Sequence, residues 1–256
     1  TTPPTAAASV SPVPIGAGWH AGVVTVEINA TDEPGGSGVR EIVIEKSGVE
    51  SDSSVVAVAV ASVQVTAEGD TTVTYRARDN AGNESVPALL VVRIDRTAPT
   101  VGFDGNAGTY GIADRVTISC VASDDLSGLA TDTCADVDAP TTSFGPGSHT
   151  LSASATDNAG NIGSGSTTFE VQVSFVDLCT LTRSYVNAAR LVPAMSNRLG
   201  ASLCAQLNAA QAAAERGNDR AKDGALKAYV SQVRAQTPAV FTAEQRDLLI
   251  ELADAL

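Results

Sequence analysis

Aromatic and basic residues are scarce in this chain of 256 residues, and their scarcity limits what it can do. Phe, Trp and Tyr make up 4% of the sequence, and Trp19 is the single tryptophan. Lys and Arg number 16 against 29 Asp and Glu, which gives a net charge of −13. Nucleic acids and anionic membranes are bound through clustered Lys and Arg. The composition therefore argues against both as partners, and the cores must be built from aliphatic residues.

Residues that carry common enzymatic chemistry are also few. The two histidines, His20 and His149, have no Ser or Cys nucleophile in a matching context, and a zinc site needs more ligands than they supply. Paired carboxylates hydrolyse glycosides in many enzymes, but this chain lacks the rings to line a sugar cleft. We therefore expect a protein that is not an enzyme, with a glycoside hydrolase fragment as the least favoured alternative.

Long apolar runs are missing as well. No apolar stretch reaches the roughly 18–20 residues that are needed to span a bilayer, so we expect no membrane insertion. The single methionine is Met195, and no signal peptide is visible at the start. We therefore expect that a leader was removed or lies outside this sequence.

Two copies of the sequence DNAGN organise the first two thirds of the chain, at residues 79–83 and 157–161. Internal repeats of this kind define the domain organisation before any other feature. Three matched elements in the same order predict two tandem domains and place residue 1 at a domain boundary, so we expect further domains of the same polypeptide upstream. The other two shared elements are a segment that reads ATD in the first copy and ASD in the second, followed by SG (residues 30–38 and 122–128), and the segments TPPT and TAPT (residues 2–5 and 97–100).

Within these repeats apolar and polar residues alternate, as in Val24, Val26 and Ile28. Short alternating strands between Gly, Asp, Asn and Ser turns are typical of antiparallel β-sandwiches. The ATD…SG loop, the DNAGN turn and the DRTAP linker at residues 95–99 resemble bacterial Ig-like families of secreted and surface proteins. The resemblance implies two Ig-like domains, at residues 1–95 and 96–173, and an extracellular location, secreted or on the cell surface. Such domains serve as spacers, adhesins and carbohydrate-binding accessories, so the fold alone does not fix the function.

The four cysteines fall into two local pairs. Four cysteines allow three connectivities, and their separation along the chain favours Cys120–Cys134 and Cys179–Cys204. Neither pair has the C-x-x-C spacing of a zinc or redox site. Disulfides predict an oxidising compartment, and the alternative is buried free thiols in a cytosolic protein.

After about residue 174 the hydrophobic period changes from 2 to 3.6, which predicts a bundle of helices over residues 174–256. Thr242 and Gln245 have the spacing of a capping box at the start of the last helix. This segment resembles the FIMAH domain at the C-terminus of secreted bacterial proteins, for which the resemblance implies no activity. Tyr229-Val230 replaces the Phe-Ile of its eponymous motif. The matching segments are LCTL (178–181), LCAQL (203–207), AAERGN (213–218), YVSQVRAQ (229–236) and TAEQRDLLI (242–250).

Carboxylates should gather where the two Ig-like repeats meet, because the loops of a sandwich emerge beside the linker at one pole. Asp95 in the linker and Asp124, Asp125 and Asp157 in the loops would form a set of oxygen ligands suited to calcium. The alternative is that these residues are turn formers that cap their own backbone. The first repeat offers a smaller set, whose linker aspartate would precede residue 1: Asp32, Glu33 and Asp79.

Together these observations predict a non-catalytic, extracellular C-terminal region of a larger secreted protein. It would act as a spacer and as a binding or adhesion module for surface polysaccharide or protein. Trp19 is the candidate ligand contact, and its alternative role is packing over a sheet edge. A second hypothesis is a structural subunit of an extracellular filament or surface layer, in which residues 1–15 form an extended arm that adds to the edge of a neighbouring copy.

Overall fold

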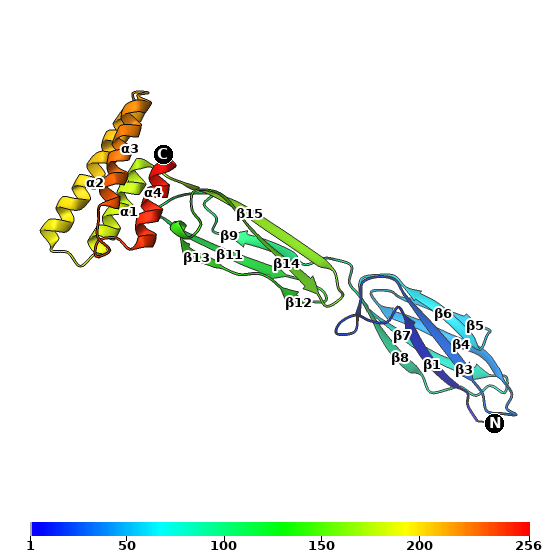
Figure 1. The fold of residues 1–256 in the computed structure, drawn as a ribbon. Helices are drawn as coiled ribbons and strands as arrows, with labels where there is room; N and C mark the ends of the chain where they lie inside the picture. The colour runs from blue at the N-terminus through cyan, green and yellow to red at the C-terminus, as the bar shows by residue number, and fades with distance from the viewer. Residues whose placement is uncertain (1) are drawn as a thin grey trace. The chain divides into compact units, whose positions relative to one another are not determined.

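The structure is a computed structural model, and it describes residues 2–256 (Figure 1). Contacts divide the chain into two compact units. The first unit holds the chain up to Gly102 together with Cys120–Cys134 and Ala153–Gly165, and the second holds Phe103–Ser119, Ala135–Ser152 and Ser166–Leu256. The architecture is two Ig-like β-sandwiches followed by four helices, so the predicted class of all-β plus all-α is confirmed.

The first sandwich consists of two antiparallel sheets with one short parallel addition. One sheet has the strand order β1-β3-β6, and the other has the order β2-β8-β7-β4-β5. β2 pairs with β8 in parallel over two residues, and the other neighbours are antiparallel. The strands are β1 (Thr5–Ser11), β2 (Trp19–His20), β3 (Val24–Thr31), β4 (Val39–Gly48), β5 (Asp52–Val56), β6 (Val60–Val65), β7 (Gly69–Asp79) and β8 (Ala88–Ile94).

The core of this sandwich follows directly from the alternation in the sequence. Successive side chains of a strand point to opposite faces of the sheet. Val24, Val26 and Ile28 of β3 are fully buried, and they belong to one cluster with Val73 of β7 and Val92 of β8. The cluster contains small aliphatic side chains and a single aromatic ring, which matches the low aromatic content of the chain.

The prediction that residues 1–15 form a free arm is wrong for residues 5–11. These residues form β1, which pairs with β3 in a continuous antiparallel register from Thr5↔Thr31 to Ser11↔Thr25. Ala6, Ala8 and Val10 pack against the core, so alternation gives this segment a buried face within its own sandwich. The segment is therefore already paired and does not offer itself to a neighbouring copy.

The second sandwich repeats the plan with fewer strands. Its two sheets have the orders β10-β15-β14-β12 and β13-β11-β9, and β10 pairs with β15 in parallel as β2 does with β8. A disulfide joins Cys120 to Cys134 across Cα atoms 5.2 Å apart, which is the predicted pair. The strands are β9 (Thr100–Asp104), β10 (Thr109–Gly111), β11 (Arg115–Ser123), β12 (Leu129–Asp132), β13 (Val137–Pro140), β14 (Gly147–Asp157) and β15 (Ile162–Gln172).

The helical part consists of α1 (Phe175–Ala188), α2 (Pro193–Ala214), α3 (Asp219–Arg234) and α4 (Ala243–Asp254). Thr242 and Gln245 form the predicted capping box at α4. α2 begins at Pro193, because proline suits the first position of a helix, where an N–H is not needed. A second disulfide joins the predicted pair, Cys179 and Cys204.

Tyr229 of α3 lies at the centre of the bundle. Its ring is fully buried, and its hydroxyl lies 2.6 Å from Thr182 Oγ1, which donates to Leu178 O at 2.7 Å. Burial raises the pKa of Tyr229, so the phenol stays neutral. Among the described residues, no helix has both the length and the apolar character that a membrane span requires.

Candidate functional site

Three aspartates of the first unit come together at the linker. Asp95 directly follows β8, Asp124 follows β11, and Asp157 ends β14. One carboxylate oxygen from each lies within 4.8 Å of the other two. Asp95 is 0% exposed, Asp157 is 2% exposed, and Asp124 is half-buried. Asp125, the fourth predicted ligand, is exposed and lies outside this group, which we call the linker triad.

The DNAGN turn explains how Asp157 reaches this place. Asp157 Oδ1 accepts a hydrogen bond from the backbone N–H of Asn161 at 2.8 Å, and Oδ2 accepts one from the Asn161 side-chain amide at 2.7 Å. Gly160 has a φ of 90°, a conformation that side chains with a Cβ rarely adopt. The motif is thus a turn that closes on its own first aspartate.

The same turn binds the linker. The side-chain amide of Asn161 donates to the carbonyl oxygen of Asp95 at 3.0 Å and to that of Thr97 at 3.4 Å. The carboxylate of Asp95 accepts from Ser127 N at 3.0 Å and from Thr97 N at 2.9 Å. Both the backbone and the side chain of Asp95 are therefore tied to loops of the second sandwich.

Asp124 shapes the loop that faces the linker. Its Oδ1 accepts from Gly128 N at 2.7 Å and from Leu126 N at 3.2 Å. The backbone of Gly128 in turn accepts from the N–H of Asn158 in the DNAGN turn at 3.0 Å. The ATD…SG loop and the DNAGN turn, which the sequence showed as separate repeated elements, are thus one hydrogen-bonded structure.

The linker triad has no compensating positive side chain. Among residues 2–256, no Lys or Arg forms a salt bridge with any of its three carboxylates, and the neighbouring Arg96 lies against Glu68 instead. Buried carboxylates a few ångströms apart repel one another unless a cation or a proton compensates them. Convergent carboxylate and carbonyl oxygens are the ligands that calcium prefers. The chemistry of these residues therefore fits a hard divalent cation.

The first repeat contains the same loop geometry without the linker aspartate. Asp32 Oδ2 accepts from Gly38 N at 2.7 Å, as Asp124 does from Gly128. Asp79 is fully buried, and hydrogen bonds from the side chain and backbone of Asn83 lower its pKa. Glu33, the third predicted carboxylate here, accepts from Thr2 N at 3.0 Å. The turn and the loop are thus features of both repeats.

A further contact at the linker involves Gly16, which belongs to none of the repeated motifs. The N–H of Gly16 donates to the carbonyl oxygen of Asn158 at 3.0 Å. A Cβ at Gly16 would lie 2.8 Å from that oxygen, so only glycine allows this approach. The loop before β2 thereby contacts the DNAGN turn of the second repeat, and nothing in the sequence distinguishes Gly16 from the other turn glycines.

The other candidate residues lie apart from the triad. Trp19 is half-buried on β2, opposite Arg93 of β8, whose Nε lies 3.7 Å from Asp70 Oδ2. His20 is buried, and His149 binds Gly145 O and lies against the ring of Phe144.

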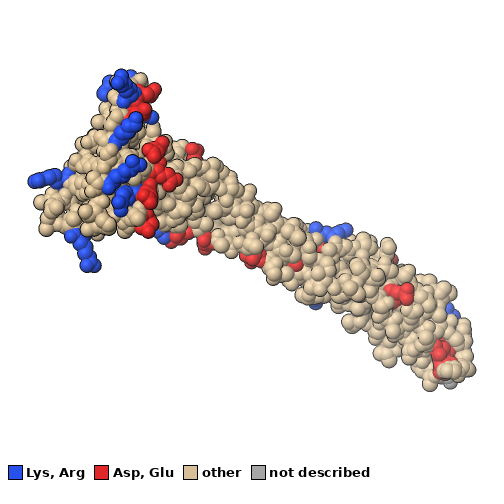
Figure 2. All heavy atoms as spheres, in the orientation of Figure 1, with Lys and Arg blue, Asp and Glu red and all other residues tan. Residues whose placement is uncertain are grey.

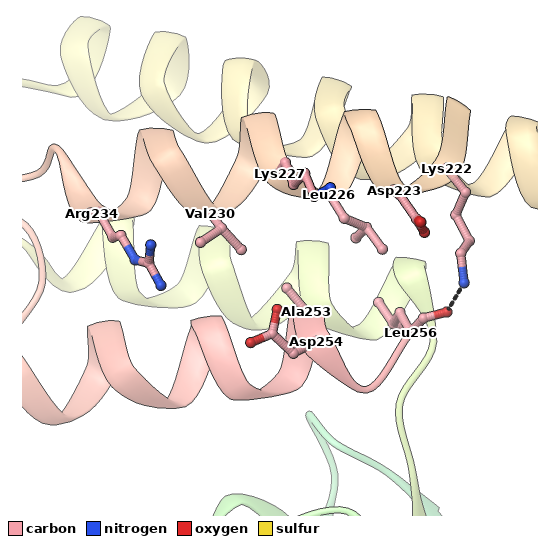
Figure 3. Close-up of a pocket in the computed structure, with 9 residues that line it drawn as sticks. All are labelled: Lys222, Asp223, Leu226, Lys227, Val230, Arg234, Ala253, Asp254 and Leu256. Carbon is pink, nitrogen blue, oxygen red and sulfur yellow. Dashed lines mark hydrogen bonds between the residues drawn. The ribbon is translucent and has the colours of Figure 1, made fainter. Parts of the chain in front are cut away.

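A hollow of about 320 Å³ lies between α3 and α4 in the helical part (Figure 3). Leu226 and Val230 form its apolar lining, whereas Lys227, Arg234 and Asp254 bring both charges to it. Figure 2 shows that many of the visible Lys and Arg side chains gather over the helices. A lining of mixed charge does not indicate a class of ligand, so we assign no function to this hollow.

No protein-family model and no curated protein matches the chain. Among solved structures, it is similar to fibronectin(III)-like modules of Clostridium thermocellum CbhA (15% identity, 65% of this chain, 95% of that chain, TM-score 0.30). It is also similar to the D00-D0 domain of intimin (14% identity, 64% and 99%, TM-score 0.30) and to protocadherin gammaB7 EC3-6 (15% identity, 67% and 51%, TM-score 0.28). Likenesses this weak carry no functional argument, and the FIMAH resemblance stays a prediction.

Proposed function

We propose that this chain is a non-catalytic spacer and binding module outside the cell, in which calcium stiffens the linker between two Ig-like sandwiches. The domains would be residues 1–95, 96–173 and 174–256. Two disulfides support an oxidising compartment. The proposed ligands are surface polysaccharide or protein, with Trp19 as the candidate contact.

The observation that carries this proposal is that the linker is buried and held by hydrogen bonds. A spacer must keep its domains from swinging freely, and a short linker alone does not ensure that. Here Asp95 is completely buried, and Pro99, which is also buried, fixes one backbone angle. The amide of Asn161 and the N–H of Ser127 bind Asp95 from the second sandwich. A linker held in this way supports a mechanical role.

Calcium would complete this arrangement. Asp95, Asp124 and Asp157 would each supply a carboxylate oxygen, and exposed Asp125 could join as a fourth ligand. The cation would remove the repulsion between the carboxylates and would connect the linker to both loops. Because such an ion binds only to the folded chain, it raises stability by about 2.7 kcal/mol when its concentration is one hundred times the dissociation constant.

The test compares melting and solution scattering with calcium and with chelator. We expect chelation to lower the melting temperature and to shorten the maximum dimension. Asp95→Asn and Asp157→Asn should each reduce this response. Asp79→Asn is the matched control, because Asp79 makes the same turn contact to Asn83 in the first repeat. It should lower stability but leave the calcium response intact. Identical melting and scattering with calcium and chelator would show that the carboxylates are turn residues only.

A further inference from the structure

Strand β8 has an edge that its own sheet leaves largely uncovered. It is the second strand in the order β2-β8-β7-β4-β5. Its outer neighbour β2 has two residues, which pair with Arg93 and Ile94. The edge of β8 from Ala88 to Val92 has no strand beside it among the residues that the structure describes.

The direction of the backbone groups on this edge follows from two hydrogen bonds. Asp95 N donates to His20 O of β2, so Asp95 directs its N–H to the outer side. In a strand this direction alternates, so Val91 and Leu89 also direct their N–H and C=O groups outward. On the inner side, Asp70 O of β7 accepts from Val49 N beside β4, so the neighbouring Thr71 of β7 faces β8, where it pairs with Val92. Leu89 and Val91 therefore present unused donors and acceptors.

The side chains on this edge do not protect it. Leu89 is 69% exposed and Val91 is 42% exposed, and the segment VPALLVV at residues 86–92 contains no charged residue. Natural proteins usually guard such edges with charges or cover them. The edge strand β6 of the same sandwich is guarded in this way, because Lys46 Nζ donates to Gln64 O at 3.2 Å. The edge of β8 has the features of a pairing surface.

We propose that β8 pairs with β8 of a second copy of this chain, in an antiparallel register centred on Leu90. Pro87 has no N–H, and β2 covers Arg93, so the usable edge is limited to residues 88–92. Centring on Leu90 places Leu89 opposite Val91 of the partner subunit and Val91 opposite Leu89 of the partner subunit. Each of these pairs exchanges both N–H···O=C bonds. The partner strand must leave the edge at its own Pro87, just before the point where β8 begins.

We assign the edge of β8 to a second copy of this chain because the edge is complementary to itself. The exposed apolar side chains of Leu89 and Val91 meet each other across the pair, where cross-strand contacts of this kind stabilise a sheet. No charge on either strand faces a like charge. A surface that contacts its own copy about a twofold axis closes after two subunits. The interface therefore gives a dimer and does not extend into a filament.

Sedimentation equilibrium of the full chain over a rising concentration tests the proposal. The wild type should shift towards the mass of two chains. Val91→Pro removes an outward N–H without touching the bonds to β7, and Val91→Lys adds a charge to the edge. Since the twofold axis doubles each change, both variants should raise the dissociation constant by at least about tenfold. Ile162→Lys is the control, because Ile162 is 70% exposed and lies on β15; it should dimerise like the wild type.

Cysteine trapping tests the register. Hydrogen-bonded residues of an antiparallel pair have Cα atoms about 5.5 Å apart, within the roughly 4.4–6.8 Å range of disulfides. The double variant Leu89→Cys/Val91→Cys should give a covalent dimer under mild oxidation, and each single variant should not. A wild type that stays monomeric at its highest soluble concentration, or a Val91→Lys variant that dimerises as tightly, would overturn the proposal. Efficient trapping by Leu89→Cys alone would overturn the register.

Discussion

Removing the side-chain amide of Asn161 should expose the linker to proteolysis. The peptide bond between Arg96 and Thr97 is a trypsin site within the linker, and Arg96 is exposed. In the folded protein the backbone on both sides of this bond is held, because the Asn161 amide binds the carbonyl oxygens of Asp95 and Thr97. A protease needs an extended, mobile segment, so cleavage here requires these bonds to open.

The structure sets the size of the effect. Each hydrogen bond contributes a net 0.5–1.5 kcal/mol or so, and Asn161→Ala removes both bonds to the linker. A loss of about 1–3 kcal/mol raises the population of the opened linker by a factor of about 5–150. When opening and closing are fast relative to cleavage, the rate of cleavage at Arg96 rises by the same factor.

Limited trypsin digestion followed by mass spectrometry measures this rate through the fragments 1–96 and 97–256. Asn106→Ala is the matched control: Asn106 binds Thr167 Oγ1 at 2.6 Å and Thr168 O at 3.0 Å, and all three residues belong to the second unit, whereas the linker belongs to the first. It should lower the melting temperature but leave cleavage at Arg96 unchanged. If Asn161→Ala is cleaved at Arg96 no faster than the wild type, the Asn161 bonds do not hold the linker.

Two further predictions concern the first sandwich. Burial alone would raise the pKa of Glu50, but hydrogen bonds from Lys46, Thr66 and Ala67 outweigh it and lower the pKa to about 2. Because the folded pKa lies below the unfolded value of about 4.3, the stabilisation is present above that value and is lost as the pH falls towards 2. Glu50→Gln should cost about 1–3 kcal/mol in urea unfolding at pH 7, and a wild-type advantage that persists undiminished at the lowest pH would contradict this. Separately, Trp19→Ala should abolish retention on the surface polysaccharides that the wild type binds, with an unchanged melting temperature; a large loss of stability with retention intact would assign Trp19 to packing.

Local rules predicted much of this fold. Alternation of apolar and polar residues located the strands because each sandwich strand has one buried face, as in β7, where Val73 and Ala77 are fully buried. The capping box at Thr242 depends on two side chains three residues apart, so the sequence alone contains it. The disulfide pairs were predictable because each joins cysteines that are close in the chain and lie in neighbouring elements.

Other features depend on tertiary contacts that no local pattern records. β1 was predicted as a free arm because its Ala and Ser residues give a weak hydrophobic signal, and its pairing with β3 decides its place. The approach of Gly16 to Asn158 joins residues far apart in the sequence. The convergence of Asp95 with the loop aspartates followed from topology, but the role of Asn161 as the donor to the linker required coordinates.

Strand β8 connects the two proposals. Its end carries Asp95 of the linker triad, and its edge carries Leu89 and Val91. The N–H of Asp95 binds His20 O, and this bond holds β2 against β8 at 2.9 Å. Because β2 covers β8 beyond Val92, it ends the usable edge there. A linker that holds Asp95 in place therefore also keeps β2 in place and the pairing surface short. A short edge is adequate for a weak, closed dimer, whereas a longer uncovered edge would invite non-specific strand addition. The residues that fix the linker therefore also limit what β8 can pair with.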